Sequence, residues 1–159
     1  TGSLGHGLPV AAGMAVVAKR TGKTHRVFCL MSDGDCNEGS TWEAMMFATQ
    51  HHLDNLTAIV DYNRIQALGR CKDVIDMEPF AAKVKDFRWA VREIDGHNYG
   101  EIRQALDDVP FEKGKPSFII AHTVKGKGVS FLEDTVACHY KHANAEELQQ
   151  AYKELGVTL

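Results

Sequence analysis

Two short apolar runs, residues 27–31 and 56–60, dominate the first half of the chain. Both are rich in strand-forming residues and nearly free of polar ones, which is typical of strands buried on both faces of a sheet. Residues 43–49 between them are good or tolerable helix formers with a broad apolar stripe, and Ser40 or Thr41 can cap the first turn. The pattern predicts a strand, a helix and a second strand.

The rest of the chain continues this alternation. A helix of small and apolar residues is expected from Ser3 or Leu4 to about Arg20, where Thr21-Gly22 ends it. The further expected elements are a short helix at 80–87, a strand at 89–94, a helix at 99–109 and a buried strand at 116–124. The alternation predicts an α/β fold with a doubly wound, mostly parallel sheet and helices on both faces. With 159 residues and 44% hydrophobic content, residues 1–159 are expected to form a single domain.

Polar residues that can bind a cation follow each of the first two runs. Asp33 comes after the first run and Asn63 after the second, and a strand-helix-strand crossover brings both to the same carboxyl edge of the sheet. One carboxylate and one amide oxygen, with places left for phosphate oxygens and water, suit Mg²⁺, whereas Ca²⁺ usually takes more oxygens. The other interpretation is an ordinary loop, since Asp, Asn and Gly dominate turns. Spacing alone leaves both interpretations open.

Composition narrows the class of protein. The 18 basic and 21 acidic residues are spread along the chain, which gives no support to a nucleic-acid or membrane-surface partner. The sequence shows no signal peptide, and its apolar stretches are shorter than the roughly 20 residues that span a bilayer. Its four cysteines form no Cys-x-x-Cys pair, so we expect no zinc site and reduced thiols in a cytoplasmic protein.

Three further polar features have competing interpretations. The Lys-Gly-Lys-Gly loop at 125–128 follows the last strand, where glycine N–H groups and lysine charge favour an anion, although Lys127 is better explained as a surface lysine. His97 lies in a turn before a helix and is better explained as a cap or loop-packing residue than as a catalytic one. Glu38, near the start of a helix, is accounted for by the helix dipole alone.

Four motifs, in order along the chain, carry a resemblance to a known family. They are Thr-Gly-Ser-Leu-Gly-His-Gly-Leu at 1–8, the Asp-Gly and Glu-Gly pairs within 33–39, Asp-Tyr-Asn at 61–63 and Thr-Val-Lys-Gly-Lys-Gly-Val-Ser-Phe at 123–131. Over essentially its whole length the chain resembles the diphosphate-binding domain of transketolases, most closely the amino-terminal subunit of the split, two-chain form. This agreement of four motifs favours the cation site over the plain loop.

The chain departs from the family pattern at two positions. Ser32 stands where the thiamine diphosphate motif has its first glycine, and Cys138 stands where an aromatic residue often precedes the late histidine. Neither change removes a polar ligand, although Ser32 can alter the turn.

The resemblance implies a site for thiamine diphosphate and Mg²⁺, with Ca²⁺ or Mn²⁺ as alternative cations. It implies metal ligation by Asp33, Asn63 and the backbone carbonyl of Ile65. The implied cofactor-binding residues are Gly2, Leu4, Asp33, Gly34, Asn63, Lys125 and His139. The implied catalytic residues are His139, which reaches the diphosphate or the reacting substrate, and Glu38, which links two active sites at a dimer interface.

The implied reaction transfers a two-carbon ketol unit from a ketose to an aldose, with sugar phosphates or related sugars as substrates. In the resembled family the acid that activates the aminopyrimidine belongs to a second domain, which in split enzymes is a separate chain. We therefore expect this chain to be inactive without a pyrimidine-binding, carboxy-terminal transketolase subunit, with which it forms a dimer or heterotetramer. The sequence opens at Thr1 directly in the glycine loop, so the family's leading segment is expected to be missing.

Two alternative functions stay in view. One is another thiamine diphosphate enzyme subunit, similar to deoxyxylulose phosphate synthase or to 2-oxo acid dehydrogenases. The stretch 125–131 with Glu133 and His139 favours transketolase over the dehydrogenases. The other is a non-catalytic interaction module of the same fold, against which the intact Asp33, Asn63 and His139 stand.

Overall fold

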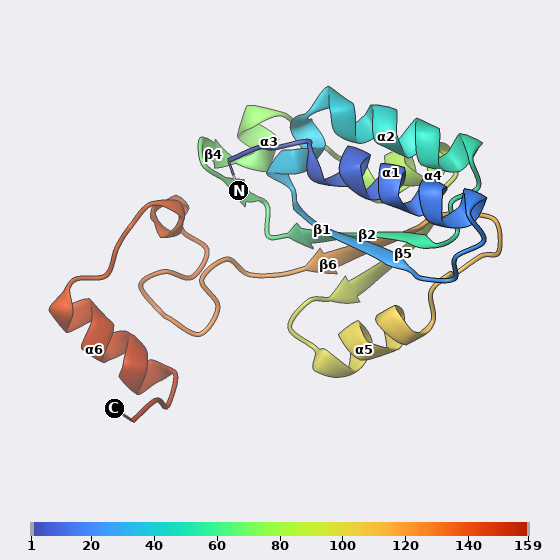
Figure 1. The fold of residues 1–159 in the computed structure, drawn as a ribbon. Coiled ribbons are helices and arrows are strands. Elements are labelled where there is room, and N and C mark those ends of the chain that lie inside the picture. Colours follow the sequence, from blue (N-terminus) through green and yellow to red (C-terminus); the bar gives the residue numbers. More distant parts are fainter. Residues whose placement is uncertain (1, 159) are drawn as a thin grey trace.

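A four-stranded parallel sheet forms the centre of the computed structural model, which describes residues 2–158. In spatial order the strands are β1 (Val27–Ser32), β2 (Leu56–Tyr62), β6 (Ser117–His122) and β5 (Ala90–Asp95). All three neighbouring pairs run parallel (Figure 1). The predicted parallel sheet is therefore confirmed, and the carboxyl ends of all four strands lie at one edge.

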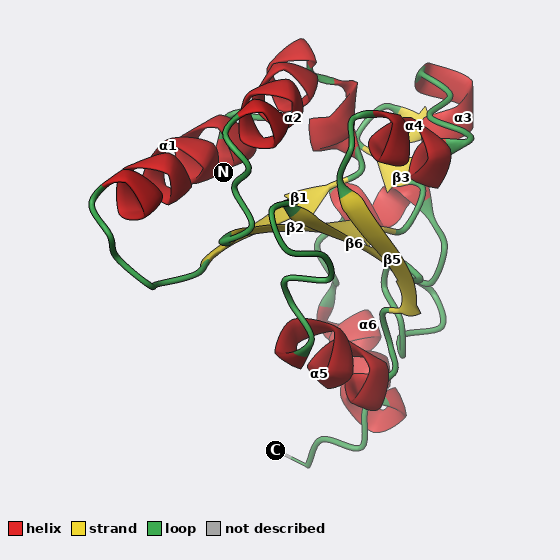
Figure 2. Ribbon diagram, turned by 90° about the vertical axis from the view of Figure 1, so that its right-hand side faces the viewer, coloured by secondary structure: helices red, strands yellow, loops and turns green. Residues whose placement is uncertain are grey.

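Helices cover both faces of this sheet. α1 (Gly7–Arg20), α2 (Gly39–Gln50) and α4 (Phe80–Asp86) lie on one face, and α5 (Tyr99–Asp107) lies on the other (Figures 1 and 2). The connections from β1 to β2 and from β5 to β6 run in opposite directions across the sheet, so right-handed crossovers place α2 and α5 on opposite faces. No helix within residues 2–158 is both long and apolar enough to cross a membrane.

The larger hydrophobic core lies between the sheet and the α1, α2 and α4 layer. Phe118 of β6 contacts Phe80 edge-on at 5.8 Å between ring centroids and Trp89 at 5.7 Å. The indole N–H of Trp89 donates to the carbonyl of Met45 at 3.1 Å, which satisfies the polar end of this buried side chain. A smaller core on the α5 side consists of Ile94, Ala105, Ile119 and Ala121.

α1 begins later than its sequence pattern predicts. The helix starts at Gly7 instead of Ser3 or Leu4, because residues 3–6 form a turn in which the His6 N–H donates to the Ser3 carbonyl at 3.3 Å. Gly5 in this turn has a positive φ of 74°, a conformation that does not continue a helix. The four residues before α1 are thus an irregular loop at the edge of the fold.

The predicted capping of α2 is wrong. A short 3-10 helix, η1 (Gly34–Asn37), precedes α2, and the N-cap residue of α2, Glu38, makes no side-chain cap bond. The hydroxyl of Ser40 donates instead to the Gly5 carbonyl at 2.8 Å, and that of Thr41 donates to the Asp35 carbonyl at 2.6 Å. Both hydroxyls therefore fix neighbouring loops and do not cap their own helix.

A small hairpin that the sequence pattern does not predict follows β2. Its strands are β3 (Ile65–Gln66) and β4 (Gly69–Arg70), and the short helix α3 (Cys71–Val74) comes directly after them. The Cys71 N–H donates to the Arg64 carbonyl at 3.0 Å and closes the base of the hairpin. Two-residue strands leave no periodic pattern in a sequence, which explains why this element escapes prediction.

The part of the chain after β6, residues 123–158, forms a C-terminal arm that extends away from the sheet (Figure 1). It contains η2 (Val136–His139) and α6 (Ala145–Glu154). α6 begins with a capping box in which Asn144 and Glu147 exchange side-chain bonds with each other's backbone N–H groups. The helix is further held by Ser130, whose N–H and hydroxyl both donate to the Glu154 carboxylate at 2.6 Å.

Candidate functional site

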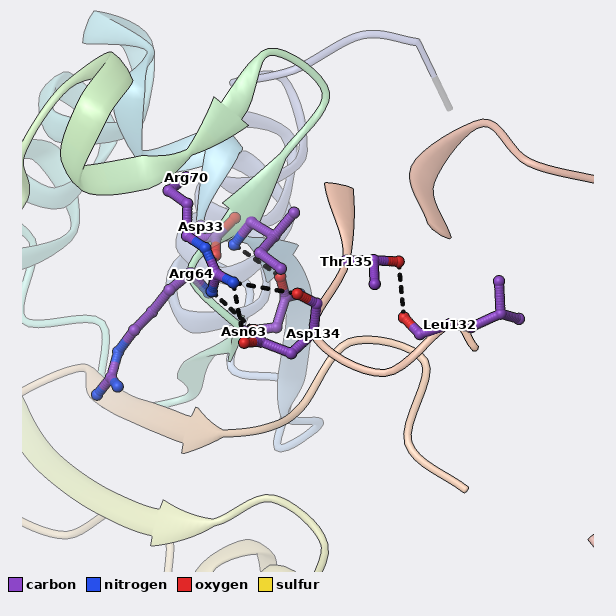
Figure 3. Close-up of polar contacts among 8 residues, drawn as sticks. Asp33, Asn63, Arg64, Arg70, Leu132, Asp134 and Thr135 are labelled. Carbon is purple, nitrogen blue, oxygen red and sulfur yellow. Dashed lines mark hydrogen bonds and ion pairs between the residues drawn. The ribbon is translucent and has the colours of Figure 1, made fainter. Parts of the chain in front are cut away.

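Asp33 and Asn63 lie together at the carboxyl edge of the sheet, directly after β1 and β2 (Figure 3). Asp33 is only 2% exposed and Asn63 is 9% exposed. The backbone N–H of Arg64 donates to Oδ2 of Asp33 at 2.7 Å, so the two strand ends are joined directly. The structure therefore confirms the predicted meeting of these two residues at one edge.

Two hydrogen bonds fix the orientation of the Asn63 amide. Its Oδ1 accepts the Ile65 N–H at 3.0 Å, and its Nδ2 donates to Oδ1 of Asp61 at 3.3 Å. The hydroxyl of Thr123, at the end of β6, donates to the same Asp61 oxygen. The amide oxygen and nitrogen are thus distinguished by their partners, and the ends of β2 and β6 are tied together.

The Asp33 carboxylate is buried without a cationic side chain beside it. Burial raises its pKa above the ordinary value, the Cys71 thiol and the Arg64 N–H lower it, and Asp61 raises it. Asp33 forms no ion pair among residues 2–158. The guanidinium of the neighbouring Arg64 points away from Asp33 (Figure 3) and lies over the Tyr62 ring, 5.4 Å from its centroid. A buried carboxylate of this kind is the environment that a bound divalent cation stabilises.

The backbone of the hairpin leaves a third oxygen available. Ile65 pairs with Arg70, and this pair is flanked by the bond from the Cys71 N–H to the Arg64 carbonyl. In an antiparallel ladder that arrangement makes Ile65 a non-hydrogen-bonded position, so the hairpin does not use its carbonyl. The carboxylate, amide and carbonyl oxygens here are the ligand types that Mg²⁺ takes, so the residues present fit such an ion.

Residues 2–158 contain no cluster of three or more His, Cys, Asp and Glu side chains that could hold a metal ion. A cation at this edge would therefore depend on the mixed set of one carboxylate, one amide and one backbone carbonyl. Such a set leaves several coordination positions for ligand oxygens and water, as is usual for Mg²⁺ beside phosphates.

A cavity of about 480 Å³ adjoins this edge on the hairpin side. The hydroxyl of Tyr62 donates to the Glu78 carboxylate at 2.7 Å on its wall, and Cys71 separates it from Asp33. Burial and the nearby Asp33 charge raise the pKa of the Cys71 thiol to about 12, so this thiol stays protonated at neutral pH. The lining residues are Tyr62, Arg64, Arg70, Cys71, Lys72, Asp76, Met77, Glu78 and Asp134.

The opening glycine loop lies beside the Asp33 turn. The Gly5 N–H donates to Oδ1 of Asp35 at 2.9 Å, two residues beyond Asp33. Gly2 and Leu4 of this loop are exposed, Leu4 by 45%, whereas Gly34 is buried. The structure thus brings the loop and the Asp33 turn together and leaves the loop's outer side open.

Glu38 lies at the junction of this loop with α2. It adopts an extended backbone with ψ of 131° and occupies the N-cap position, one residue before the first helical turn. Its side chain is exposed. A Cβ added at Gly5 would come within 2.5 Å of the Glu38 Cβ, which shows how closely the two segments pack.

Lys125 and His139 lie on the C-terminal arm. Lys125 is half-buried and its carbonyl accepts the Asp134 N–H at 2.9 Å. His139 is exposed, and its ring contacts that of Tyr140 at 5.0 Å between centroids. Within residues 2–158 no hydrogen bond joins either residue to the Asp33 edge.

The arm is nevertheless attached to the hairpin beside the metal-ligand candidates. The Arg70 guanidinium makes a two-pronged ion pair with the Asp134 carboxylate at 2.7 and 2.9 Å (Figure 3). The Tyr140 hydroxyl donates to the Ala67 carbonyl at 2.9 Å. These contacts hold η2, and with it His139, against the hairpin that starts at Ile65.

The Lys-Gly-Lys-Gly loop differs in part from its predicted state. The Gly128 N–H is not available to an anion, because it donates to the Glu133 carboxylate at 2.9 Å. Lys127 is exposed and its Nζ lies 3.6 Å from the same carboxylate, as expected for a surface lysine.

The loop-packing interpretation of His97 is confirmed, since its Nε2 accepts the Val124 N–H at 2.8 Å.

Sequence reasoning missed three residues that organise the site. Arg64 acts through its backbone N–H, Asp35 through a bond to the distant Gly5, and Arg70 through an ion pair with the arm. Each contact joins segments far apart in the chain, so no local pattern reports it. Asp35 alone had a visible cue in the sequence, because it is an additional acid directly after the Asp33-Gly34 pair.

The fold and this site define a cofactor-binding α/β domain. Comparison with known families identifies the family to which this domain belongs. Residues 1–158 match the family described as the thiamine diphosphate binding domain of transketolase. The chain belongs to this family. The match spans the four motifs on which the predicted resemblance rests.

Curated relatives include proteins named as subunits of transketolases. One component of the apulose-4-phosphate transketolase of Actinobacillus succinogenes is 40% identical over 155 residues, which cover 98% of this chain and 56% of that protein. The 6-deoxy-6-sulfo-D-fructose transketolase subunit SqwG of Clostridium sp. is also 40% identical over 155 residues, with the same shares. The chain thus spans about half the length of the curated relatives it matches.

A solved structure supports the same assignment. The transketolase of Campylobacter jejuni superimposes with a TM-score of 0.91 at 33% sequence identity, covering 99% of this chain and 26% of that one. The arrangement of sheet and helices described above is therefore that of transketolases.

Proposed function

We propose that this chain is a single diphosphate-binding domain that holds thiamine diphosphate through Mg²⁺ bound to Asp33, Asn63 and the Ile65 carbonyl. One observation carries the proposal: a carboxylate only 2% exposed, without an ion-pair partner in the described chain, lies beside a fixed amide oxygen at the carboxyl edge of the sheet. Parallel α/β sheets bind ligands at this edge. Ca²⁺ and Mn²⁺ take the same oxygen ligands and are alternative occupants.

When bound, the cofactor supplies a carbon nucleophile toward the ketose carbonyl, and the protein contributes binding and orientation. Gly34, Lys125 and His139 are the proposed contacts of this chain to the diphosphate end. Gly2 and Leu4, on the loop tied to Asp35, are the proposed contacts to the aminopyrimidine. The exposed outer side of that loop supports such a role, since Leu4 is 45% exposed.

The proposed reaction is the transfer of a two-carbon ketol unit from a ketose to an aldose. It is supported by the family assignment and by the names of the relatives, which are components of transketolases. Those names refer to a sugar phosphate in one case and a sulfo-sugar in the other. A sugar phosphate or related sugar is therefore the proposed substrate class.

The proposed assembly is a dimer or heterotetramer with a pyrimidine-binding transketolase chain in the cytoplasm, without which this chain is inactive. The relatives' names support a partner chain, because they describe those proteins as subunits. Val10, Met14 and Val17 form an apolar stripe on α1 and are 62%, 57% and 60% exposed, which suits a protein–protein interface. Glu38, exposed at the start of α2, is the proposed link between active sites.

Titration calorimetry of the full-length protein with thiamine diphosphate tests the proposal, with and without Mg²⁺ and with and without the candidate partner. We expect Mg²⁺-dependent binding that is lost in Asp33→Ala. Unchanged affinity in Asp33→Ala would refute the assignment of Asp33. Absence of binding by the unmodified protein under all four conditions would leave a non-catalytic interaction module of the same fold.

A further inference from the structure

We propose that Asp35 is a positioning residue that fixes the opening loop, residues 2–6, to the metal-binding end of β1. This inference rests on the proposed function and deepens it. The opening loop is the proposed wall of the aminopyrimidine site, and Asp33 is the proposed anchor of the diphosphate. A residue that joins them would set the distance between the two ends of one cofactor.

The Asp35 carboxylate bonds to both segments at once. Its Oδ1 accepts the Gly5 N–H at 2.9 Å, across 30 residues of sequence. Its Oδ2 accepts both the N–H and the hydroxyl of Ser32, each at 2.9 Å. The Asp35 N–H in turn donates to the Ser32 hydroxyl oxygen at 3.2 Å. One side chain therefore links the last residue of β1 to the opening loop.

Gly5 packs closely against Glu38 and Ser40 at the start of α2. Gly5 has a φ of 74°, and a Cβ there would lie 2.5 Å from both the Glu38 Cβ and the Ser40 Oγ. Its carbonyl accepts the Ser40 hydroxyl at 2.8 Å, so both backbone groups of Gly5 are bonded. The Asp35 carbonyl accepts the Thr41 hydroxyl at 2.6 Å, which ties the same unit to α2.

A carboxylate suits this task better than a neutral side chain. Asp35 makes no ion pair within the part of the chain that the structure describes, so N–H and O–H donors alone compensate its charge. Bonds to an ionised acceptor are about twice as strong as neutral ones. Apart from the bond from the Ser40 hydroxyl to the Gly5 carbonyl, the other hydrogen bonds of the loop are local, such as the His6 N–H to the Ser3 carbonyl at 3.3 Å. Without Asp35, the Ser40 hydroxyl is the only one of these side chains that still holds the loop.

Ser32 supplies a matched control. It stands where the resembled motif has glycine, and its hydroxyl adds a donor to Asp35 without contacting the loop. Ser32→Gly removes that hydroxyl and leaves both the Ser32 N–H and the Gly5 bond in place. Asp35→Ala removes the link itself.

The test compares two ligands in the full-length protein by titration calorimetry: thiamine diphosphate with Mg²⁺, and inorganic pyrophosphate with Mg²⁺. We expect Asp35→Ala to weaken thiamine diphosphate binding about tenfold or more and to change pyrophosphate binding less than about twofold. A general loss of structure would weaken both ligands alike. Ser32→Gly should bind both ligands within about threefold of the unmodified protein.

Hydrogen exchange of the Gly5 amide in the ligand-free protein reports on the link separately, and we expect it to accelerate at least about tenfold in Asp35→Ala. Unchanged exchange, unchanged thiamine diphosphate affinity, or an equal loss of both ligands would each overturn the role of Asp35. Failure of the unmodified protein to bind either ligand would refute the proposed function itself, and the exchange result would still show whether the link exists.

Discussion

The backbone N–H of Arg64 donates to the carboxylate of Asp33 at 2.7 Å and joins the ends of two neighbouring parallel strands. Arg64 has a φ of 65°, a conformation that is uncommon for a residue with a side chain. The chain thus turns sharply after Asn63 and presents consecutive backbone groups to one carboxylate and one amide. Local strain of this kind is characteristic of functional sites and agrees with a ligand-binding role for this edge.

Two glycines of the first segment should respond to alanine in opposite ways. Gly5→Ala places a Cβ 2.5 Å from the Glu38 Cβ at a φ of 74°, so we expect a loss of about 1–3 kcal/mol in unfolding free energy. Gly13→Ala, inside α1 with no heavy atom within 4 Å of the added Cβ, should gain about 0.5–1 kcal/mol. Urea denaturation of the two variants measures both values. Equal effects of the same sign would contradict the described docking of the opening loop.

The ion pair between Arg70 and Asp134 should govern the order of the C-terminal arm and contribute little to global stability. The two side chains are 40% and 57% exposed, so solvent screens the attraction between them. We expect Asp134→Asn to leave the midpoint of urea denaturation nearly unchanged and to accelerate hydrogen exchange of the η2 amides. Asparagine is the suitable replacement because position 134 has a φ of 53°, which Asn tolerates.

Arg103→Ala is the control for that experiment. Arg103 pairs with Asp107 at 3.7 Å on the surface of α5, far along the chain from the hairpin contact. It should leave the exchange of η2 unchanged. Equal acceleration in both variants, or none in Asp134→Asn, would show that the arm is held by other contacts.

Glu78 should make the stability of the fold depend on acidic pH. Bonds from the Phe80 N–H at 3.0 Å and the Tyr62 hydroxyl at 2.7 Å lower its pKa below the ordinary value of 4.5. Because the folded-state pKa is lower, the unfolded chain binds the proton first as pH falls. The stabilisation is therefore present above about pH 4.5 and is lost as pH falls through the folded-state pKa.

The expected contribution of Glu78 is only about 0.5 kcal/mol, since the residue is exposed and solvent screens its carboxylate. Urea denaturation of the unmodified protein and of Glu78→Gln near neutral pH and at about pH 3 measures it. The difference between the two proteins should shrink at the lower pH. Glu43→Gln, an exposed residue of α2, serves as the control, and a constant difference for Glu78→Gln across this range would exclude the mechanism.

The sequence predicts the framework of the site because the framework depends on strands and one crossover. The apolar runs before Asp33 and Asn63 are sufficient to place both residues at one sheet edge, and the register of β1 with β2 bears this out. The capping box of α6 is also readable from Asn144 and Glu147, although no helix was predicted there.

The contacts that refine the site are long-range and left no local pattern. Ser40 and Thr41 look like helix caps, yet α2 already begins at Gly39, and their hydroxyls donate to the backbone carbonyls of Gly5 and Asp35. α1 likewise begins at Gly7 and not at the predicted Ser3 or Leu4. The residues before it form a loop that is hydrogen-bonded to Asp35 through the Gly5 N–H. Such tertiary contacts override local propensity.

Binding of Mn²⁺, followed by the electron paramagnetic resonance of the free ion, tests the central claim most directly. In the full-length protein, addition of thiamine diphosphate should sharply increase Mn²⁺ binding, since the diphosphate completes a shell begun by Asp33, Asn63 and the Ile65 carbonyl. Asp33→Asn, which keeps the size of the side chain, should abolish this increase. Equal cofactor-dependent Mn²⁺ binding by Asp33→Asn and the unmodified protein would contradict the assignment of this edge as the metal and diphosphate anchor.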